Sequence, residues 1–164
     1  MKIAQTIACV HHYFSQIPQS LIALLGRFSI AAVFWRSGQT KVEGFALDIF
    51  QGTVNIGWPA LSDNAVFLFK EEYQLPLIAP ELGATLAAFA EHFFPILILF
   101  GLATRLSAFA LLVMTAVIQV LVYPGAYPTH GVWAAVLLYL MATGSGVVSL
   151  DHLLKRRCAA RAPR

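Results

Sequence analysis

The chain has 164 residues, of which 59% are apolar and only 12% are charged. Soluble domains average about 45–50% apolar and about 25% charged residues, so this composition excludes a disordered chain and disfavours a soluble domain. A mean hydropathy of +0.72 indicates an integral membrane protein. The net charge is +3, and the basic residues gather at the C-terminal end instead of forming a stripe, so we expect no nucleic-acid partner.

Residues 1–19 are too polar to span a membrane. Apolar side chains nevertheless recur three or four positions apart between residues 3 and 17, which places them on one stripe of a helix. Pro18 ends this helix or opens the next one. We interpret the segment as a helix that lies on the cytoplasmic surface of the membrane, and a frayed terminus is the alternative.

The first apolar run that is long enough to span a bilayer covers residues 21–38 and contains two arginines. An arginine at the centre of a span costs about 2.5–3.5 kcal/mol on insertion scales. Arg36 lies near the end of the run, where its long side chain can reach the interface. Arg27 lies close to the middle and cannot easily do so.

Three more apolar runs follow, at residues 79–103, 106–122 and 131–150. Each has about the length that a spanning helix needs. Together with the first run, they predict an all-α fold, a membrane-spanning four-helix bundle over residues 20–155. A basic tail at residues 156–164 ends the chain.

The connection at residues 39–78 is long and charged, and glycine and proline interrupt it. It holds two amphipathic pieces, one at residues 45–50 and one that begins near Ser62 or Asp63, either of which is a plausible N-cap. We expect this connection to form an amphipathic external lid between the first two spans. A passive surface loop is the alternative.

Positive residues in short loops mark the cytoplasmic side of a membrane protein. With four spans, seven lysines and arginines fall on the side of the two termini, and two, Lys41 and Lys70, fall on the other side. This imbalance predicts that both termini are cytoplasmic in a bacterial inner membrane. Arg105 and Asp151 then belong to a cytoplasmic turn and to a cytoplasmic helix end.

Arg27 and Glu91 are the strongest charges within the spans. Each lies near the middle of its run, so antiparallel neighbouring helices would place them at similar depth. A bonded pair is much cheaper in hydrocarbon than either charge alone, and we therefore predict an ion pair. Whether the pair is a structural bridge or a site for a proton, an anion or a quinone headgroup stays open.

A second set of polar residues is expected near the outer end of the bundle, opposite the cytoplasmic side. The set comprises Arg36, Lys41, Gln119 and His130. These residues could form a shallow ligand or quinone pocket, or they could anchor helix ends at the boundary. His92 is a further candidate, and the alternative for it is a hydrogen-bonded core histidine. The five histidines have no metal-ligand spacing, so we expect no metal site and no complete catalytic constellation.

The order of the motifs resembles the DoxX family of bacterial four-helix membrane proteins over roughly residues 20–155. The motifs are Gly26-Arg27, Gly38-xx-Lys41, Glu91, Gly101-Leu-Ala-Thr-Arg105-Leu, His130 and Gly144-Ser-Gly146-Val-Val-Ser149-Leu-Asp151. The functional positions that this resemblance implies are Arg27, Lys41, Glu91, Arg105 and His130.

The resemblance also implies a protein linked to redox or sulfur metabolism, because the family's namesake accompanies a quinol-oxidising, thiosulfate-linked complex. We therefore expect a non-catalytic subunit or membrane partner of a redox assembly, with quinone as the one conceivable cofactor. Such a protein would contact the lipid bilayer and a membrane or soluble redox protein, and homo-oligomers stay open. The alternative is a small transporter or channel that uses the intramembrane charges as a proton or substrate relay. An autonomous quinone-dependent enzyme is least favoured, since no ligands for a redox cofactor are visible.

Overall fold

The computed structural model describes residues 2–48 and 52–161. In chain order the helices and strands are α1 (Lys2–Ser15), α2 (Gln19–Gln39), β1 (Val42–Asp48), β2 (Thr53–Leu61), α3 (Asp63–Leu68), the π-helical turn η1 (Phe69–Tyr73), α4 (Pro80–Phe100), α5 (Thr104–Val117), the π-helical turn η2 (Ile118–Val122), the 3-10 turn η3 (Pro124–Ala126), α6 (Tyr127–Thr143) and α7 (Leu150–Arg161). Mostly helical structure agrees with the sequence-based expectation.

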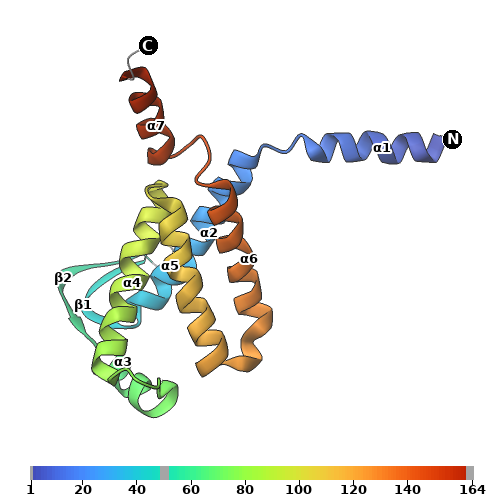
Figure 1. Cartoon of the computed structure of the whole chain (residues 1–164). Coiled ribbons are helices and arrows are strands. Elements are labelled where there is room, and N and C mark those ends of the chain that lie inside the picture. Colours follow the sequence, from blue (N-terminus) through green and yellow to red (C-terminus); the bar gives the residue numbers. More distant parts are fainter. Residues whose placement is uncertain (1, 49–51, 162–164) are drawn as a thin grey trace.

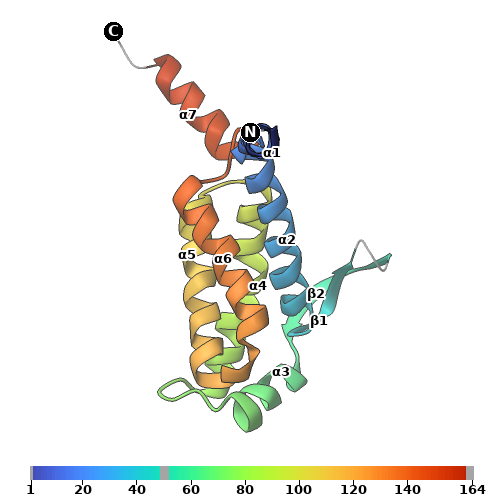
Figure 2. The same ribbon diagram turned by 90° about the vertical axis from the view of Figure 1, so that its right-hand side faces the viewer.

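Helices α2, α4, α5 and α6 lie side by side (Figures 1 and 2). Helix α2 packs against α4, α4 against α5, α5 against α6, and α6 back against α2. Their shared interior is apolar and closely packed, and its largest fully buried side chains include Phe34, Ile30, Ile98, Leu111, Leu137 and Leu140. Many leucine, valine and phenylalanine side chains also remain exposed on the outer faces of these helices. Such an outer surface suits lipid rather than water.

Three helical stretches, Gln19–Gln39, Pro80–Phe100 and Thr104–Val122, are long and apolar enough to cross a membrane. Helix α6 has 17 residues and stops at Thr143, so the predicted fourth span, residues 131–150, does not continue as one helix. Gly144 ends the helix with a positive φ of 82°, which a residue without a Cβ adopts readily. The segment between α6 and α7 is therefore free to fold against neighbouring helix ends.

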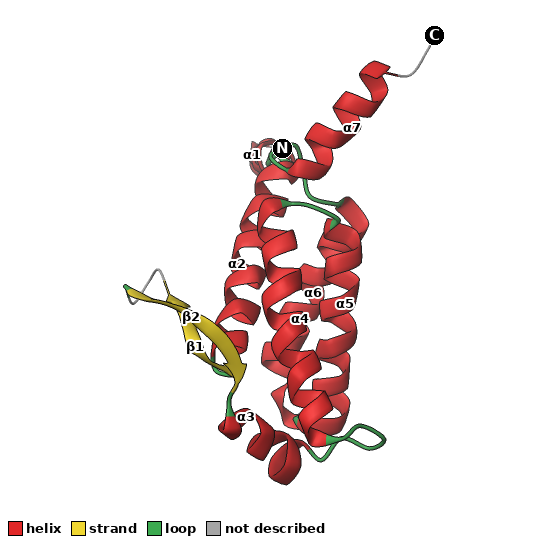
Figure 3. Ribbon diagram, turned by 90° about the vertical axis from the view of Figure 1, so that its left-hand side faces the viewer, coloured by secondary structure: helices red, strands yellow, loops and turns green. Residues whose placement is uncertain are grey.

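The connection after α2 contains a two-stranded antiparallel sheet, so the all-α prediction is wrong for Val42–Asp48 and Thr53–Leu61. Strand β1 pairs with β2 from Val42 opposite Leu61 to Asp48 opposite Thr53, with an irregularity near Glu43. Strand β2 carries Thr53, Val54, Ile56 and Trp58, and such β-branched and aromatic residues fit a pleated sheet better than a helix. Figure 3 shows the hairpin projecting from the side of the helices.

Helix α3 follows the hairpin and begins where the sequence indicates. Ser62 is its N-cap, and the Ser62 hydroxyl accepts a hydrogen bond from the Ala65 amide. Helices α1 and α7 lie at the same end of the four packed helices as the α4–α5 turn, whereas α3 lies at the opposite end (Figures 1 and 3). The packed helices thus have two ends, which we call the terminal end, where α1 and α7 lie, and the lid end, where α3 lies.

Candidate functional site

A cavity of about 360 Å³ lies among α2, η1, α4, α5 and α6 towards the lid end. Its walls are mostly apolar and include Val33, Phe34, Phe69, Leu86, Ala87, Val113, Met114, Val117 and Trp133. Polar groups enter from a few positions, namely Ser37, Lys41, Tyr73, Glu91, Tyr123 and His130. A few polar groups set in a largely apolar wall are typical of small-molecule sites, whose volumes are commonly about 300–1,000 Å³.

Lys41 and Glu91 form a buried ion pair in the wall of this cavity. The Lys41 Nζ lies 2.6 Å from the Glu91 Oε2, and it also donates to the Ser37 hydroxyl at 3.1 Å and the Ser37 carbonyl at 3.3 Å. Lys41 follows the end of α2, and Ser37 lies one helical turn earlier, so the lysine side chain reaches back along the helix. The ammonium and its contacts compensate the carboxylate inside an apolar surrounding.

The predicted Arg27–Glu91 ion pair is wrong. Arg27 is buried, but its guanidinium donates to three main-chain carbonyls, those of Ser145 at 2.6 Å, Val148 at 2.8 Å and Leu99 at 3.1 Å. The reason is depth. Gly38, eleven residues further along α2 than Arg27, lies against Glu91, whereas Arg27 lies level with the last turn of α4, where its guanidinium reaches the Leu99 carbonyl. There the last turn of α4 and the α6–α7 connection offer carbonyl oxygens that lack helical partners.

His130 brings a second polar group to the cavity from the first turns of α6. Its Nδ1 lies 2.8 Å from the Gln119 Oε1, and its ring packs against Trp133 at a centroid distance of 5.0 Å. The Gln119 Nε2 donates to the Pro124 carbonyl at 2.7 Å, which leaves the amide oxygen as the acceptor for the imidazole. The His130 Nδ1 is therefore assigned as the donor to this oxygen, and in the tautomer with a single proton Nε2 is the acceptor nitrogen.

Two residues of the predicted outer pocket lie elsewhere. Arg36 is 62% exposed and sits 3.8 Å from Asp48 of β1, outside the cavity. His92 packs edge-on against Trp35, with hydrogen bonds to the Gln39 Nε2 at 2.8 Å and the Ala88 carbonyl at 2.7 Å. It is the hydrogen-bonded core histidine of the alternative interpretation. The cavity thus gathers Lys41 and His130, and Gln119 supports His130 from behind.

The cavity also has wall residues that sequence reasoning missed. Tyr123 and Tyr73 pack edge-to-face with ring centroids 5.8 Å apart, and the Tyr123 hydroxyl donates to the Glu72 Oε1. This hydrogen bond to a carboxylate, together with partial burial, raises the pKa of Tyr123 above its usual value. The contacts tie η1 to the turn after η2 across the end of the cavity. The acids and the tyrosine of η1, together with the tyrosine that follows η2, were the available sequence signal for this contact.

Arg105 and Asp151 line a second cavity at the terminal end without forming an ion pair with each other. The Asp151 carboxylate accepts hydrogen bonds from the backbone amides of Ala103 at 2.9 Å and Thr104 at 3.1 Å. The backbone amide of Asp151 donates to the Gly101 carbonyl at 2.9 Å. Asp151 thereby fastens the start of α7 to the α4–α5 turn and satisfies the first amides of α5. Among the residues that the structure describes, no group of three or more histidine, cysteine or acidic side chains could hold a metal ion.

Three apolar helical stretches of spanning length, an outer surface of exposed apolar side chains and an internal cavity with a buried ion pair define a helical membrane protein. The chain belongs to the DoxX family, whose pattern matches residues 22–124. It is also 28% identical over 142 residues to an uncharacterized protein of Haemophilus influenzae, an alignment that covers 81% of this chain and 83% of the relative. No solved structure matches the chain.

Proposed function

We propose that this protein is a non-catalytic inner-membrane partner or subunit of a redox assembly and that its cavity holds a quinone-type ligand. The observation that carries the proposal is the cavity itself. It combines apolar walls from four helices with the buried Lys41–Glu91 pair and the His130 imidazole. A quinone or quinol likewise combines a polar part, the oxygen-bearing ring, with an apolar part, the tail.

The hydrogen-bonding pattern at His130 favours the reduced, hydroxyl-bearing form of such a ligand. Because Nδ1 is bonded to the Gln119 oxygen, Nε2 is left with a lone pair that can accept a hydrogen bond. Within the described part of the chain, no residue bonds to Nε2. A quinol hydroxyl would meet this acceptor, whereas a quinone carbonyl would require the imidazole to take up a second proton. Lys41, held by Ser37 and Glu91, would supply positive charge near the ring oxygens.

The segment from β1 to η1 supports the lid role. Phe69 and Tyr73 of η1 line the cavity, and Tyr123 and Glu72 link this segment to the turn before α6. In the proposed orientation, with both termini in the cytoplasm, the lid covers the cavity from outside the membrane. A reporter fused after Arg164 should be active only in its cytoplasmic form, and strong periplasmic activity would reject this orientation.

Trp133 offers a direct test of ligand binding, because it lines the cavity beside His130. Titrating the detergent-solubilised protein with a short-chain quinol should quench tryptophan fluorescence saturably. Trp133→Phe should remove most of the quenching, whereas Trp58→Phe, on the exposed hairpin, should leave it unchanged. His130→Phe should weaken binding of the quinol more than binding of the matching quinone. Quenching that does not saturate, or that survives in Trp133→Phe, would reject the proposed ligand site.

The redox-partner role needs a separate measurement. We expect an oxidoreductase subunit to co-purify with the tagged protein in mild detergent, and its loss in a lid-deleted variant would locate the contact. The alternative, transport by the protein alone, draws on the buried Lys41–Glu91 charges. Against a continuous path, Ile98, Leu111, Leu137 and Leu140 fill the interior. Proton or anion flux in liposomes that contain only this protein would favour transport.

A further inference from the structure

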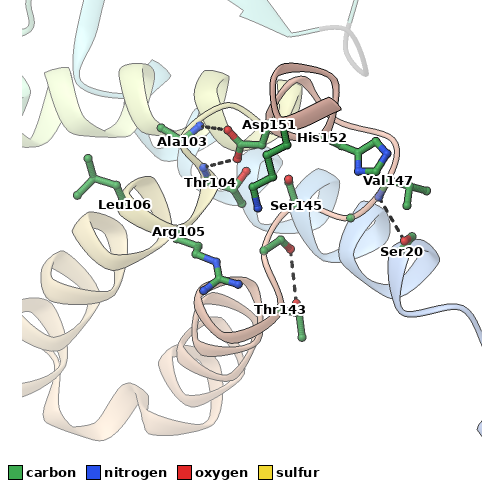
Figure 4. A pocket seen from close by; sticks show the side chains of 13 residues that line it. Ser20, Ala103, Thr104, Arg105, Leu106, Thr143, Ser145, Val147, Asp151 and His152 are labelled. Carbon is green, nitrogen blue, oxygen red and sulfur yellow. Dashed lines mark hydrogen bonds between the residues drawn. The ribbon is translucent and has the colours of Figure 1, made fainter. Parts of the chain in front are cut away.

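We propose that a second cavity, at the terminal end, is a binding site for a phosphate group. This cavity of about 510 Å³ lies between the start of α5, the α6–α7 connection and α7. Figure 4 shows Thr104 and Arg105 on one side, Ser145 and Val147 on the connection, and His152 on α7. It is separate from the cavity that Lys41, Glu91 and His130 line, and the proposal does not rest on the function suggested for that cavity.

The cavity holds two positive charges without an ion-pair partner. Arg105 and Lys155 line it together with the His152 imidazole, and among the described residues no carboxylate lies within ion-pair distance of these three side chains. Asp151 also lines the cavity, but both of its oxygens are occupied by the Ala103 and Thr104 amides. The acid is therefore committed to capping α5 and leaves the cations available to an external anion.

A buried hydroxyl in the wall lacks a partner. The Thr104 side chain is 0% exposed, its Oγ1 has no hydrogen-bond partner, and the residue belongs to the cavity wall (Figure 4). The other hydroxyls of the wall are engaged, since Ser20 accepts the Val147 amide and Ser145 donates to Ser149. A buried hydroxyl without a partner is costly, so the free Thr104 hydroxyl indicates that a polar ligand completes the site.

A phosphate group fits this combination of donors. Arginine binds phosphate oxygens through two parallel hydrogen bonds, lysine adds charge, and an imidazole N–H and a hydroxyl each donate a further bond. Leu106 and Val147, both exposed, form apolar edges of the same cavity. Such edges suit the glycerol and acyl carbons of a phospholipid, but the phosphate chemistry is shared with free inorganic phosphate. The experiment must therefore compare the two sources.

The test uses the full chain in an uncharged detergent, and it measures the affinity of a short-chain phosphatidylglycerol and of inorganic phosphate by calorimetry at constant ionic strength. The pocket variant is Arg105→Gln with Lys155→Gln. The matched control is Arg156→Gln with Arg157→Gln, which removes the same charge from α7 outside the cavity wall. We expect the pocket variant to lose about tenfold or more in affinity and the control about twofold or less.

Thr104→Val keeps the shape of the side chain and removes the hydroxyl, so it tests the site even if the double variant folds poorly. It should weaken binding about fivefold while the protein keeps its thermal stability or gains some. Binding of the lipid alone would identify a headgroup site, and saturable binding of inorganic phosphate would identify a free-anion site. The proposal is overturned if neither probe binds, or if the pocket and tail variants lose affinity equally.

Discussion

The Lys41–Glu91 pair gives the sharpest test of how this fold tolerates charge in its interior. The two side chains are only 10% and 3% exposed, and the Nζ–Oε2 distance is 2.6 Å. At an effective dielectric constant of about 20, this separation corresponds to an attraction of about 6 kcal/mol. Desolvation of both groups offsets most of it, so the pair as a whole contributes little net stability.

Removing one partner has a different effect, because the other charge is then stranded. Glu91→Leu and Lys41→Met should each lower the free energy of unfolding by about 3–5 kcal/mol. Lys41 keeps its contacts with Ser37 when the acid is removed, so Glu91→Leu should fall at the lower end of this range. The double variant should recover most of the loss, because neither charge is buried any longer.

The assay is equilibrium unfolding in mild detergent, followed by tryptophan fluorescence, for the wild type, both single variants and the double variant. Arg36→Met is the matched control, since Arg36 is largely exposed beside Asp48, and an exposed ion pair contributes less than about 1 kcal/mol. Additive losses, with a coupling energy below about 0.5 kcal/mol, would show that the two residues do not act as a pair. If the wild type shows the proposed quinol binding and the folded double variant does not, the pair belongs to the ligand site as well.

Three further predictions use the same protein preparation. Arg27→Leu removes three hydrogen bonds to carbonyls and should cost about 3 kcal/mol or more in the unfolding assay; a loss below about 1 kcal/mol would contradict the assigned contacts. Gly101→Ala should destabilise by about 1–3 kcal/mol more than Gly52→Ala, because both glycines have positive φ but an added Cβ would lie 2.5 Å from a side-chain carbon only at Gly101. Glu72→Gln should lower the pKa of Tyr123 towards 10.0, as followed by tyrosinate absorbance. In the wild type the folded state holds the phenolic proton more tightly than the unfolded state does. The stabilisation from this hydrogen bond is therefore complete below about pH 10 and declines above it.

The sequence predicts the apolar helices well, because hydropathy and length determine which stretches can cross a membrane. It also predicts that Glu91 is buried, but not that Lys41 is its partner. Lys41 follows the apolar run and counts as an outer charge by position, yet its flexible stem carries the ammonium back to the carboxylate. Composition and spacing cannot show such a return of a side chain towards the interior.

The error at Arg27 has a different physical origin. Charge pairing considers only side chains, whereas the two terminal nitrogens of the Arg27 guanidinium are bonded to main-chain carbonyls, which every residue carries and no sequence pattern distinguishes. The hairpin was missed because the long connection was treated as helical or irregular. Its alternation of β-branched and aromatic residues, clearest at Val54, Ile56 and Trp58, was the local signal for strands.

The contacts of Arg27 also set an order of events during synthesis. Helix α2 has a mean hydropathy of 1.3, against 2.1 for Thr104–Val122, so it enters the bilayer with the smaller apolar driving force. Two of the three carbonyls that Arg27 bonds belong to Ser145 and Val148, which the ribosome adds 118 and 121 residues after Arg27. Helix α2 therefore carries a guanidinium that lacks two of its carbonyl partners until the α6–α7 connection has been synthesised. A chain that stops at Thr143 lacks those partners, which makes secure insertion of its beginning depend on completion of its end.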